Sequence, residues 1–428
     1  MADDTKKELR SKMIYQVFVR NYSEDGIFAS VERDLDRIKS LGTDIVYFLP
    51  IHPIGKKSRK GVLGSPYAIS DYRAVNPEYG TMDDFKGLVD SIHEKGMKCM
   101  IDVVYNHTSP DSLLSKEHPE WFYHKPNGDF GNRVGYWSDI IDLDYSQKGL
   151  WDYQIETLVQ WAKIVDGFRC DVAPLVPIGF WERARKAVSQ IKPDFIWLSE
   201  SVDPGFITYL RGRGMTALSD GEIFRAFDIS YDYDIYGLWK SYLEEGTSLE
   251  KYAEAVNRQE YIYPDNYIKL RFLENHDQER ARSFIRDERA LRVCTAFMLF
   301  QKGATLVYAG QEYGASHRPS LFDKDTVNMK PEDSVDLTNL IKAMSQLKKD
   351  EIFSLGSYSV KAHGNDFLSA QYTYGERKAL GLFPLKAQSG SFPAEIPDGI
   401  YRNEVTGEKT EVRGSCVNCS GEAIILFL

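Results

Sequence analysis

The stretch KCMIDVVYNH, residues 98–107, reads as a buried β-strand that ends in polar side chains. Its first seven residues are mostly apolar, and Asn106 and His107 follow shortly after them. Three further apolar runs end in acids, namely GFRCD (167–171), WLSE (197–200) and FLENHD (272–277). If these strands are parallel, their carboxyl ends meet on one rim. The sequence therefore predicts a cluster of carboxylates at that rim.

Strand-like and helical stretches alternate over residues 9–349, which is typical of βα units and a parallel sheet. Eight strands are predicted, at residues 14–19, 44–49, 98–104, 167–172, 195–199, 225–229, 268–273 and 305–308. Helices are predicted at residues 31–40, 82–95, 150–164, 179–191, 249–258, 290–301 and 335–347, most of them ending at a Gly or Pro. Eight such repeats predict an α/β fold, the (β/α)8 TIM barrel.

Two regions depart from this repeat. Residues 108–146, after the third strand, are rich in aromatic and turn residues and predict an inserted subdomain. Beyond residue 349 short alternating strands are separated by Gly, Pro and Asn, and no good helix is apparent. We therefore predict a small C-terminal all-β sandwich domain at residues 350–428.

The composition limits the possible partners. The chain has 53 Lys and Arg residues against 63 Asp and Glu residues, a formal net charge of −10, without a long basic block. Neither nucleic acid nor a membrane is therefore expected as a partner. The N-terminal stretch lacks an apolar signal-peptide core, and we expect a cytoplasmic protein that is a monomer or a weak homo-oligomer. Of five cysteines, Cys416 and Cys419 form a lone CVNC that we expect to be free thiols in a surface loop.

The strand-end motifs resemble, in order and spacing, those of the α-amylase family of glycoside hydrolases. The matching stretches are DVVYNH (102–107), GFRCD, the isolated Glu200 and FLENHD. GSPYAISDYRAVNPEYGT (64–81) and LVYAGQEYG (306–314) also look like this family. The resemblance covers nearly the whole chain and implies a retaining, α-glucan-active enzyme of the bacterial α-amylase type.

The resemblance implies three catalytic carboxylates. Asp171 is the nucleophile, Glu200 the general acid/base, and Asp277 the group that stabilises the transition state. Glycosidic cleavage passes through an oxocarbenium-like state, so one carboxylate attacks while a protonated one supplies a proton to the leaving oxygen. Crowding by Asp171 and Asp277 is expected to raise the pKa of Glu200 and keep it protonated.

The substrate-binding residues implied by the resemblance are a ring-stacking aromatic and two histidines that donate hydrogen bonds to sugar hydroxyls, namely Tyr67, His107 and His276. Arg169 lies two residues before Asp171 on a strand and points to the same face, where it is expected to orient Asp171 and keep it ionised. Asp102 is expected to lie behind the site and to hydrogen-bond Arg169.

A metal site is also implied. Asn106 corresponds to a calcium ligand in many relatives, and acids of the inserted loop complete the site there. The candidate partner is Asp144, with Asp139 and Asp142 as alternatives. Oxygen ligands of this kind suit Ca²⁺, but Asn106 alternatively ties the loop down. We expect no required cofactor, with Ca²⁺ as the one candidate.

One departure from the family concerns the leaving-group side. Many α-amylases follow the nucleophile with a Lys-His pair, whereas this chain has Pro174 and Leu175 there, which predicts an apolar subsite. Three functions stay open. The first is a hydrolase of α-1,4-glucosidic bonds in maltodextrins or starch-like glucans. The second is an α-glucosidase, a glucan transglycosylase or a glycoside phosphorylase using the same site. The third is a non-catalytic carbohydrate-binding relative, against which the retained acids argue.

Overall fold

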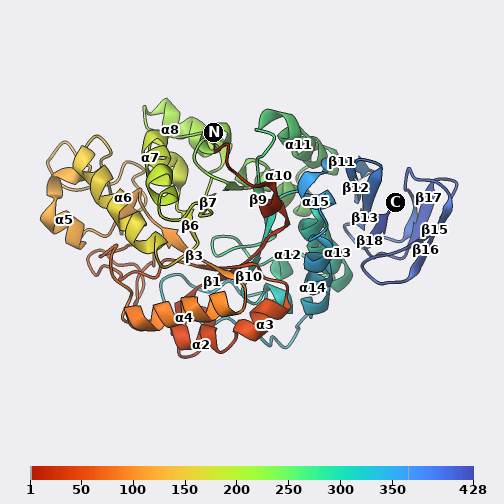
Figure 1. The fold of residues 1–428 in the computed structure, drawn as a ribbon, viewed down its shortest axis with the longest axis horizontal. Coiled ribbons are helices and arrows are strands. Elements are labelled where there is room, and N and C mark those ends of the chain that lie inside the picture. The colour runs from red at the N-terminus through yellow and green to blue at the C-terminus, as the bar shows by residue number, and fades with distance from the viewer. Residues whose placement is uncertain (1, 365) are drawn as a thin grey trace.

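A closed barrel of eight strands forms the centre of the protein in the computed structural model, which describes residues 2–364 and 366–428 (Figure 1). The strands follow one another round the barrel in the order β1-β10-β9-β8-β7-β6-β3-β2. Their bounds are β1 (Met13–Val17), β2 (Ile45–Phe48), β3 (Lys98–Val103), β6 (Gly167–Cys170), β7 (Ile196–Ser199), β8 (Ile229–Tyr231), β9 (Lys269–Arg271) and β10 (Ala304–Tyr308). Every neighbouring pair is parallel, so the predicted TIM barrel is confirmed.

One strand lies later in the chain than predicted. The apolar run at residues 225–229 predicts the sixth strand, but β8 begins only at Ile229. The preceding residues form helix α9 (Asp220–Ile223), which starts where the Ser219 N–H donates to the side chain of Glu222. The backbone N–H of Arg225 donates to the Glu222 carbonyl in a turn that continues this helix. The prediction was wrong because local helix hydrogen bonds take up the donors that a strand would need.

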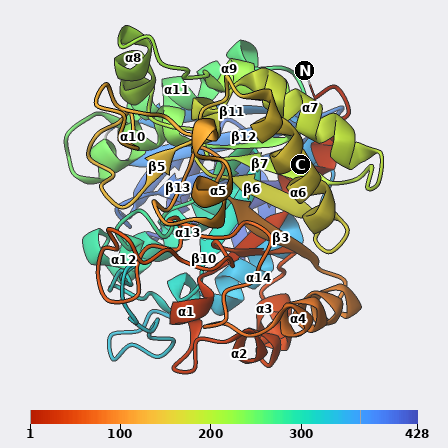
Figure 2. The same cartoon turned by 90° about the vertical axis from the view of Figure 1, so that its left-hand side faces the viewer.

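Helices surround the strands, as seen when the barrel is viewed from the side that carries α5 (Figure 2). Those of ten or more residues are α4 (Met82–Glu94), α6 (Lys148–Ala162), α7 (Ile178–Ser189), α10 (Tyr233–Leu243), α11 (Leu249–Ile262), α13 (Glu288–Phe300) and α14 (Thr338–Leu347). Shorter ones are α1 (Val19–Tyr22), α2 (Phe28–Glu32), α3 (Leu35–Ser40), α5 (Leu113–Glu117), α8 (Pro204–Gly212), α12 (Ala281–Phe284) and α15 (Ile352–Leu355). Single 3₁₀ turns are η1 (Lys7–Ser11), η2 (Pro119–Trp121), η3 (Ala173–Leu175) and η4 (Gln311–Tyr313).

Helices α8 and α10 were not predicted. α8 begins at Pro204, and the side chain of Asp203 accepts hydrogen bonds from the N–H groups of Gly205 and Phe206. α10 is rich in Tyr, Ile and Trp, residue types that favour strands, and contains Gly237. Its apolar face is buried on the barrel, so tertiary packing and not propensity decides its form.

The inserted segment leaves the barrel after β3 and contains little regular structure besides α5 and η2. Its first and last strands, β4 (His107–Thr108) and β5 (Ile141–Asp142), pair antiparallel with His107 opposite Asp142. This pairing brings the end of the insertion back beside the carboxyl end of β3. In Figure 1 α5 lies at one end of the molecule and the C-terminal strands lie at the other.

The C-terminal strands form two antiparallel sheets, in the orders β11-β12-β13-β18 and β14-β17-β16-β15. Their bounds are β11 (Ser357–His363), β12 (Phe367–Tyr374), β13 (Arg377–Pro384), β14 (Gly390–Pro393), β15 (Gly399–Arg402), β16 (Lys409–Arg413), β17 (Cys416–Cys419) and β18 (Ile424–Phe427). The side chain of Asn257 on α11 exchanges two hydrogen bonds with the backbone of Val360, at 2.7 and 2.8 Å, which ties β11 to the barrel. Cys416 and Cys419 lie on β17 and not in a loop, and both are free thiols.

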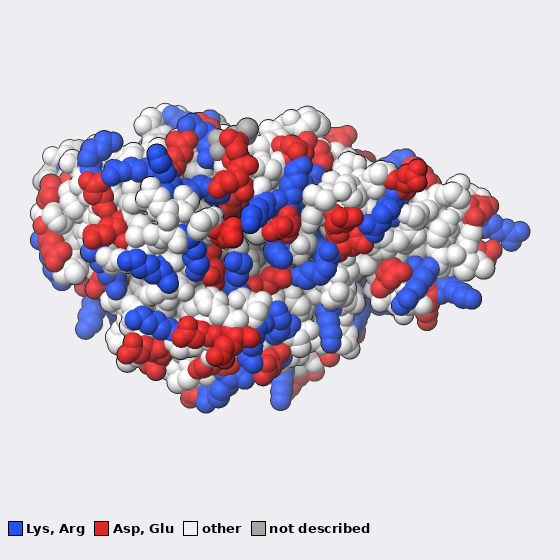
Figure 3. Space-filling model, in the orientation of Figure 1, with Lys and Arg blue, Asp and Glu red and all other residues white. Residues whose placement is uncertain are grey.

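Acidic and basic side chains are interspersed over the face shown in Figure 3. Among the helices of the described residues, none is long and apolar enough to span a membrane.

Candidate active site

The acids predicted from the strand ends lie at the carboxyl end of the barrel. Asp171 directly follows β6, Glu200 directly follows β7, and Asp277 lies in the loop after β9. Asp102 on β3 lies opposite Arg169 on β6 in the strand register. Asp171 and Glu200 are each 7% exposed, whereas the Asp277 side chain is 40% exposed. The cluster is therefore most open to solvent at Asp277.

The guanidinium of Arg169 connects the carboxylates. Its Nη1 donates to both oxygens of Asp102 and to Oδ1 of Asp171, each at 2.9 Å. Its Nη2 lies 2.8 Å from Oε1 of Glu200, but the direction of the N–H groups does not make this ion pair a hydrogen bond. Asp171 is thus held through Oδ1, while its Oδ2 takes no part in this interaction.

Burial raises the pKa values of the two less exposed acids, Asp171 and Glu200. It raises the pKa of Asp171 well above its ordinary value, and the Glu200 carboxylate adds to the rise while Arg169 opposes it. Burial also raises the pKa of Glu200, against the effect of Arg169 and with a contribution from Asp277. The sequence analysis considered only the effect of Arg169, which favours the ionised form of Asp171. In the structure burial has a larger effect on the pKa of Asp171 than Arg169 has, and it raises that pKa. Two acids crowded in one buried space favour sharing a single proton.

The pKa of Asp277 is shifted in the opposite direction, below its ordinary value. Burial raises its pKa, but the charge and hydrogen bond of His276 outweigh that effect and lower it. Nε2 of His276 lies 3.0 Å from Oδ2 of Asp277. Gln16 Nε2 lies within hydrogen-bond distance of Nδ1 of His276, at 2.9 Å. Gln16, on β1, therefore orients the histidine toward Asp277.

Tyr67 is fixed on the same side of the site. Its ring stacks on His276 with centroids 5.5 Å apart and planes inclined by 14°. The Tyr67 hydroxyl lies 2.6 Å from His276 Nε2 and donates to Asp102 Oδ2 at 3.1 Å. Tyr47, on β2, donates to the same Asp102 oxygen at 2.6 Å. Sequence reasoning missed Gln16 and Tyr47, although both lie on barrel strands and are polar residues in otherwise apolar runs.

His107 lies on the other side of Asp171. Asn106 Nδ2 donates to its Nδ1 at 3.1 Å, and its Nε2 lies 3.9 Å from Asp171 Oδ2. Burial lowers the pKa of His107 to about 4, so the imidazole is neutral near pH 7. With Nδ1 accepting, the Nε2–H is free to donate to a bound hydroxyl.

Val172, which follows the nucleophile candidate, has an unusual backbone. Its φ and ψ are 34° and 44°, in the left-handed region that β-branched residues avoid. In this conformation its N–H donates to Oε2 of Glu200 at 2.8 Å. The strained residue therefore links the ends of β6 and β7. No sequence signal predicted it.

The oxygen atoms suggested for Ca²⁺ face cations of the protein. Asn106, Asp142 and Asp144 line one cavity of about 550 Å³ together with Arg133 and Arg213. Arg133 Nη1 lies 3.8 Å from Asp142 Oδ2, and its Nη2 lies 3.9 Å from Asp144 Oδ1. Within the described residues, no three His, Cys, Asp or Glu side chains are grouped closely enough to hold a metal ion.

Two further contacts weaken the fit. Arg133 Nη1 also donates to the carbonyl of Leu143 at 3.3 Å, and Lys60 pairs with Asp139 at 2.8 Å. A Ca²⁺ ion between Asp142 and Asp144 would be repelled by the guanidinium that already lies beside them. The residues present therefore do not fit the calcium site that the sequence suggests.

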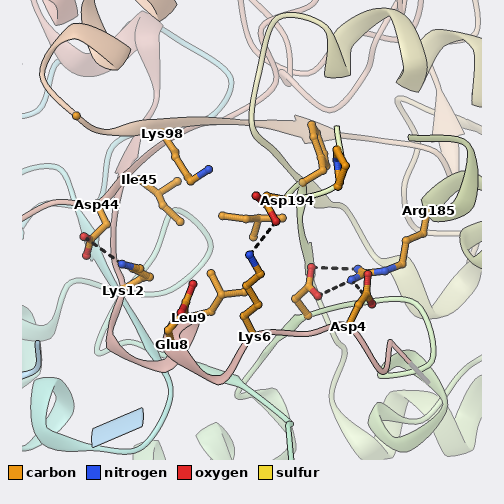
Figure 4. A pocket seen from close by; sticks show the side chains of 15 residues that line it. Asp4, Lys6, Glu8, Leu9, Lys12, Asp44, Ile45, Lys98, Arg185 and Asp194 are labelled. Carbon is orange, nitrogen blue, oxygen red and sulfur yellow. Dashed lines mark hydrogen bonds and ion pairs between the residues drawn. The ribbon is translucent and has the colours of Figure 1, made fainter. Parts of the chain in front are cut away.

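A second cavity, of about 260 Å³, lies at the opposite end of the barrel, beside the first residues of β2, β3 and β7 (Figure 4). Lys6 pairs there with Asp194 at 2.8 Å, and Arg185 pairs with Asp4 at 2.9 Å. These acids are largely exposed and each is paired with a cation, whereas Asp171 and Glu200 at the other end of the barrel are buried. We therefore place the active site at the carboxyl end of the strands.

Comparison with known proteins agrees with this fold. The sequence model described as "Alpha amylase, catalytic domain" matches residues 16–131 and 116–353, and that described as "Bacterial Alpha amylase C-terminal domain" matches residues 359–426. The crystal structure of an α-amylase from Lactobacillus plantarum is 46% identical, with a TM-score of 0.96 over 99% of this chain and 100% of that one. A maltogenic α-amylase from Thermotoga neapolitana is 34% identical, with a TM-score of 0.87 over 98% of this chain and 99% of that one.

A curated relative with a different activity also matches. The alpha-1,4-glucan:maltose-1-phosphate maltosyltransferase of Myxococcus xanthus is 32% identical over 265 residues, which are 56% of this chain. The match spans only 38% of that relative's length. The two family models, the near-complete structural matches and the barrel with acids at its strand ends lead to one conclusion: the chain belongs to the α-amylase family and is a glycosidase-type enzyme of that family.

Proposed function

We propose that the protein is a retaining glycoside hydrolase that cleaves α-1,4-glucosidic bonds in maltodextrins or starch-like α-glucans. The observation that carries the proposal is the connection of three carboxylates, Asp102, Asp171 and Glu200, by the buried guanidinium of Arg169. This arrangement supplies a fixed carboxylate and a neighbouring acid with a raised pKa. These are the two groups that retaining glycosidases need.

In the first step, Asp171 forms a bond to the anomeric carbon as the bond from that carbon to the leaving sugar oxygen breaks. Its Oδ2 is the attacking atom, because Oδ1 is held by Arg169. Glu200 gives its proton to the leaving oxygen, so a covalent glycosyl-Asp171 ester and a free sugar end result. The single proton that the coupled pair favours is the one used here.

In the second step, the Glu200 carboxylate takes a proton from water while the water oxygen attacks the anomeric carbon and Asp171 leaves. Two successive inversions retain the anomeric configuration. Asp277, with its lowered pKa, is ionised throughout and stabilises positive charge that develops on the sugar.

The same site holds the sugar in this proposal. Tyr67 stacks against the ring in the cleavage subsite, and His107 and His276 donate to its hydroxyls. The neutral state of His107 supports its assignment. The assignment of His276 is supported by its position beside Asp277 and Tyr67. Asp102 acts behind them through Arg169 and Tyr67.

We propose that no metal ion is required, because Arg133 lies beside the acids that a Ca²⁺ site would use. The five free cysteines suit a reducing compartment such as the cytoplasm. The runner-up function is transfer of the glycosyl group to another sugar or to phosphate, which the similarity to a maltosyltransferase favours.

A product time course tests the proposal. Maltoheptaose, starch, pullulan, isomaltose and sucrose are incubated with purified protein, products are separated by chromatography, and the anomeric form is followed by NMR. Short maltodextrins released first as the α-anomer support a retaining hydrolase. Products longer than the substrate support transfer, and absence of turnover that persists at high protein concentration contradicts both. Asp171→Asn serves as the inactive control.

A further inference from the structure

An irregular loop that follows β10 contacts three other segments at the carboxyl end of the barrel. We name residues 317–327 the rim loop. The first contact is with Asn21 on α1, whose side chain is buried. Asn21 donates to the carbonyl of Ser320 at 2.7 Å and accepts from the N–H of Asp325 at 2.9 Å. One buried side chain thus fixes two points of the rim loop.

The second contact is with the segment that leads to Tyr67. The backbone N–H groups of Leu63 and Gly64 both donate to the carbonyl of Phe322 at 3.0 Å. Tyr67 follows Gly64 by three residues and stacks on His276 in the site. The rim loop therefore holds the chain just before a residue of the site.

The third contact is with the loop after β9, which carries Asp277. Nη1 of Arg318 donates to the backbone carbonyl of Asp277 at 3.0 Å. In the reverse direction, Nε of Arg280 donates to the backbone carbonyl of His317 at 3.2 Å. Two arginines therefore cross between the loops in opposite directions and hold them together.

Arg280 forms the buried part of this connection. Its Nη1 donates to Oε1 of Glu274 at 2.6 Å, and its Nη2 donates to the carbonyl of Ala309 at 2.9 Å. Both members of the Arg280–Glu274 pair are almost fully buried, and the pair brackets residues 275–279. Breaking a buried ion pair costs roughly 3–5 kcal/mol. Arg280 is therefore expected to be needed for folding.

Arg318 differs from Arg280 because its side chain is 42% exposed. Its acidic neighbour, Glu279, is 53% exposed and lies 3.5 Å away. Exposed ion pairs of this kind add little to stability. The closer contact of Arg318 is the hydrogen bond to the carbonyl of Asp277, so it can be changed without breaking the core.

The backbone of Asp277 depends on such a contact more than the other two acids do. The N–H groups of Asp171 and Glu200 donate to carbonyls of neighbouring barrel strands, so the barrel fixes them. Asp277 lies six residues beyond the end of β9. Its N–H donates to the side chain of Asn275 in the same loop, and its carbonyl accepts from Arg318.

We propose that Arg318 is a positioning residue, which holds the backbone of Asp277 so that its carboxylate stays where positive charge develops on the sugar. The inference rests on the proposed function and deepens it. Arg318 acts through Asp277 and forms no bond to the reacting atoms. An interaction that matters only in the transition state changes kcat and kcat/KM equally and leaves KM unchanged.

The first test is the steady-state kinetics of Arg318 variants on maltoheptaose. Arg318→Ala and Arg318→Met, the second of which keeps an apolar stem without donors, are expected to lower kcat and kcat/KM about tenfold with KM within about twofold. Arg318→Lys keeps a cationic donor and is expected to return kcat to within about threefold of the wild-type value. Circular dichroism verifies that each variant is folded.

A double-mutant cycle shows whether Arg318 acts through Asp277. Rates are measured with α-maltosyl fluoride, an activated substrate, at high protein concentration. Arg318→Ala is expected to lower the rate about tenfold in the wild-type background and less than about twofold in Asp277→Ala, where the carboxylate is already missing. A residue that only stabilises the fold would cause the same loss in both backgrounds.

Two controls address the exposed charges. Glu279→Gln removes the ion pair of Arg318 and leaves its hydrogen bond to Asp277, so kcat is expected to stay within about twofold. Arg292→Ala removes a 40% exposed arginine that pairs with Glu288 on α13, outside the site, and is expected to change neither kcat nor KM.

The outcomes separate the inference from the proposed function. Unchanged kcat in Arg318→Ala and Arg318→Met, or equal losses in both backgrounds of the cycle, overturn the positioning role while the hydrolase stands. A raised KM at constant kcat also overturns it, because Arg318 then binds sugar directly. A wild-type protein that turns over neither substrate contradicts the proposed function itself, and with it the inference.

Discussion

The backbone N–H of Val172 donates to Oε2 of Glu200 at 2.8 Å, from a left-handed conformation with φ of 34°. A β-branched residue in this region carries strain of roughly 1–3 kcal/mol. Glycine adopts the same conformation without this cost. Strain at this place is consistent with a backbone held for function, since it connects the proposed nucleophile and proton donor.

Val172→Gly is therefore expected to stabilise the protein and to impair it at once. Relief of strain raises the free energy of unfolding by roughly 1 kcal/mol. The backbone of glycine is more flexible, so the N–H of residue 172 is held less firmly toward Glu200, and kcat falls severalfold. Denaturant unfolding and steady-state kinetics measure the two effects, with Val172→Ala as the control that keeps the conformational constraint. A less stable variant with unchanged kcat would refute this account of Val172.

Replacement of Arg169 by Gln is expected to shift the pH dependence of activity. The guanidinium lowers the pKa values of Asp171 and Glu200, so its removal raises both. The acid limb of the kcat/KM profile, which reports the free enzyme, then moves to higher pH by about one unit or more. Stability falls as well, because buried carboxylates lose their partner. An acid limb that stays in place or moves to lower pH would show that Arg169 does not control these acids.

Asp171→Asn is expected to abolish activity and to stabilise the protein at neutral pH. The folded pKa of Asp171 is raised above its unfolded value, so its contribution to stability is present at low pH and is lost as the pH rises through the folded pKa. At pH 7 the buried Asp171, ionised or sharing a proton, therefore lowers the free energy of unfolding, and replacement by Asn removes this effect. Thermal unfolding at pH 4 and pH 7 measures this, and Asp333→Asn, at an exposed position, is the control. A lower melting temperature at pH 7 would contradict the argument.

Chelation is expected to leave the protein unchanged, because the guanidinium of Arg133 lies within 3.9 Å of both Asp142 and Asp144 and repels a Ca²⁺ ion. Melting temperature with EDTA and with added CaCl₂ should agree for the wild-type protein. Arg133→Ala should melt at a lower temperature and regain part of the loss in CaCl₂, whereas Arg402→Ala, at an exposed position, should do neither. A lower melting temperature of the wild-type protein in EDTA would support a bound Ca²⁺ ion and contradict this expectation.

The barrel was predictable from the sequence because apolar runs and helical stretches alternate with a regular period. The sixth strand was misplaced because α9 and its turn use residues of apolar character, and only hydrogen bonding distinguishes them from a strand. Helix α10 escaped prediction for a related reason. Its Tyr, Ile and Trp residues favour strands, and burial against the barrel overrides that preference.

The acids of the site were predictable because each ends a strand, whereas their partners were not. Gln16 contacts His276 across 260 positions of sequence, and Tyr47 contacts Asp102 across 55. Such contacts depend on closure of the barrel and leave no local pattern. The contact of Val172 with Glu200 depends on a backbone conformation that its residue type disfavours.

The most direct test of the central claim is covalent capture of the intermediate. A fluorinated maltosyl fluoride, whose glycosyl-enzyme breaks down slowly, is incubated with the protein, which is then digested and analysed by peptide mass spectrometry. The account predicts a single glycosyl adduct on Asp171, absent from Asp171→Asn, and release of the α-anomer from normal substrates. An adduct on another residue, or release of the β-anomer, would contradict it.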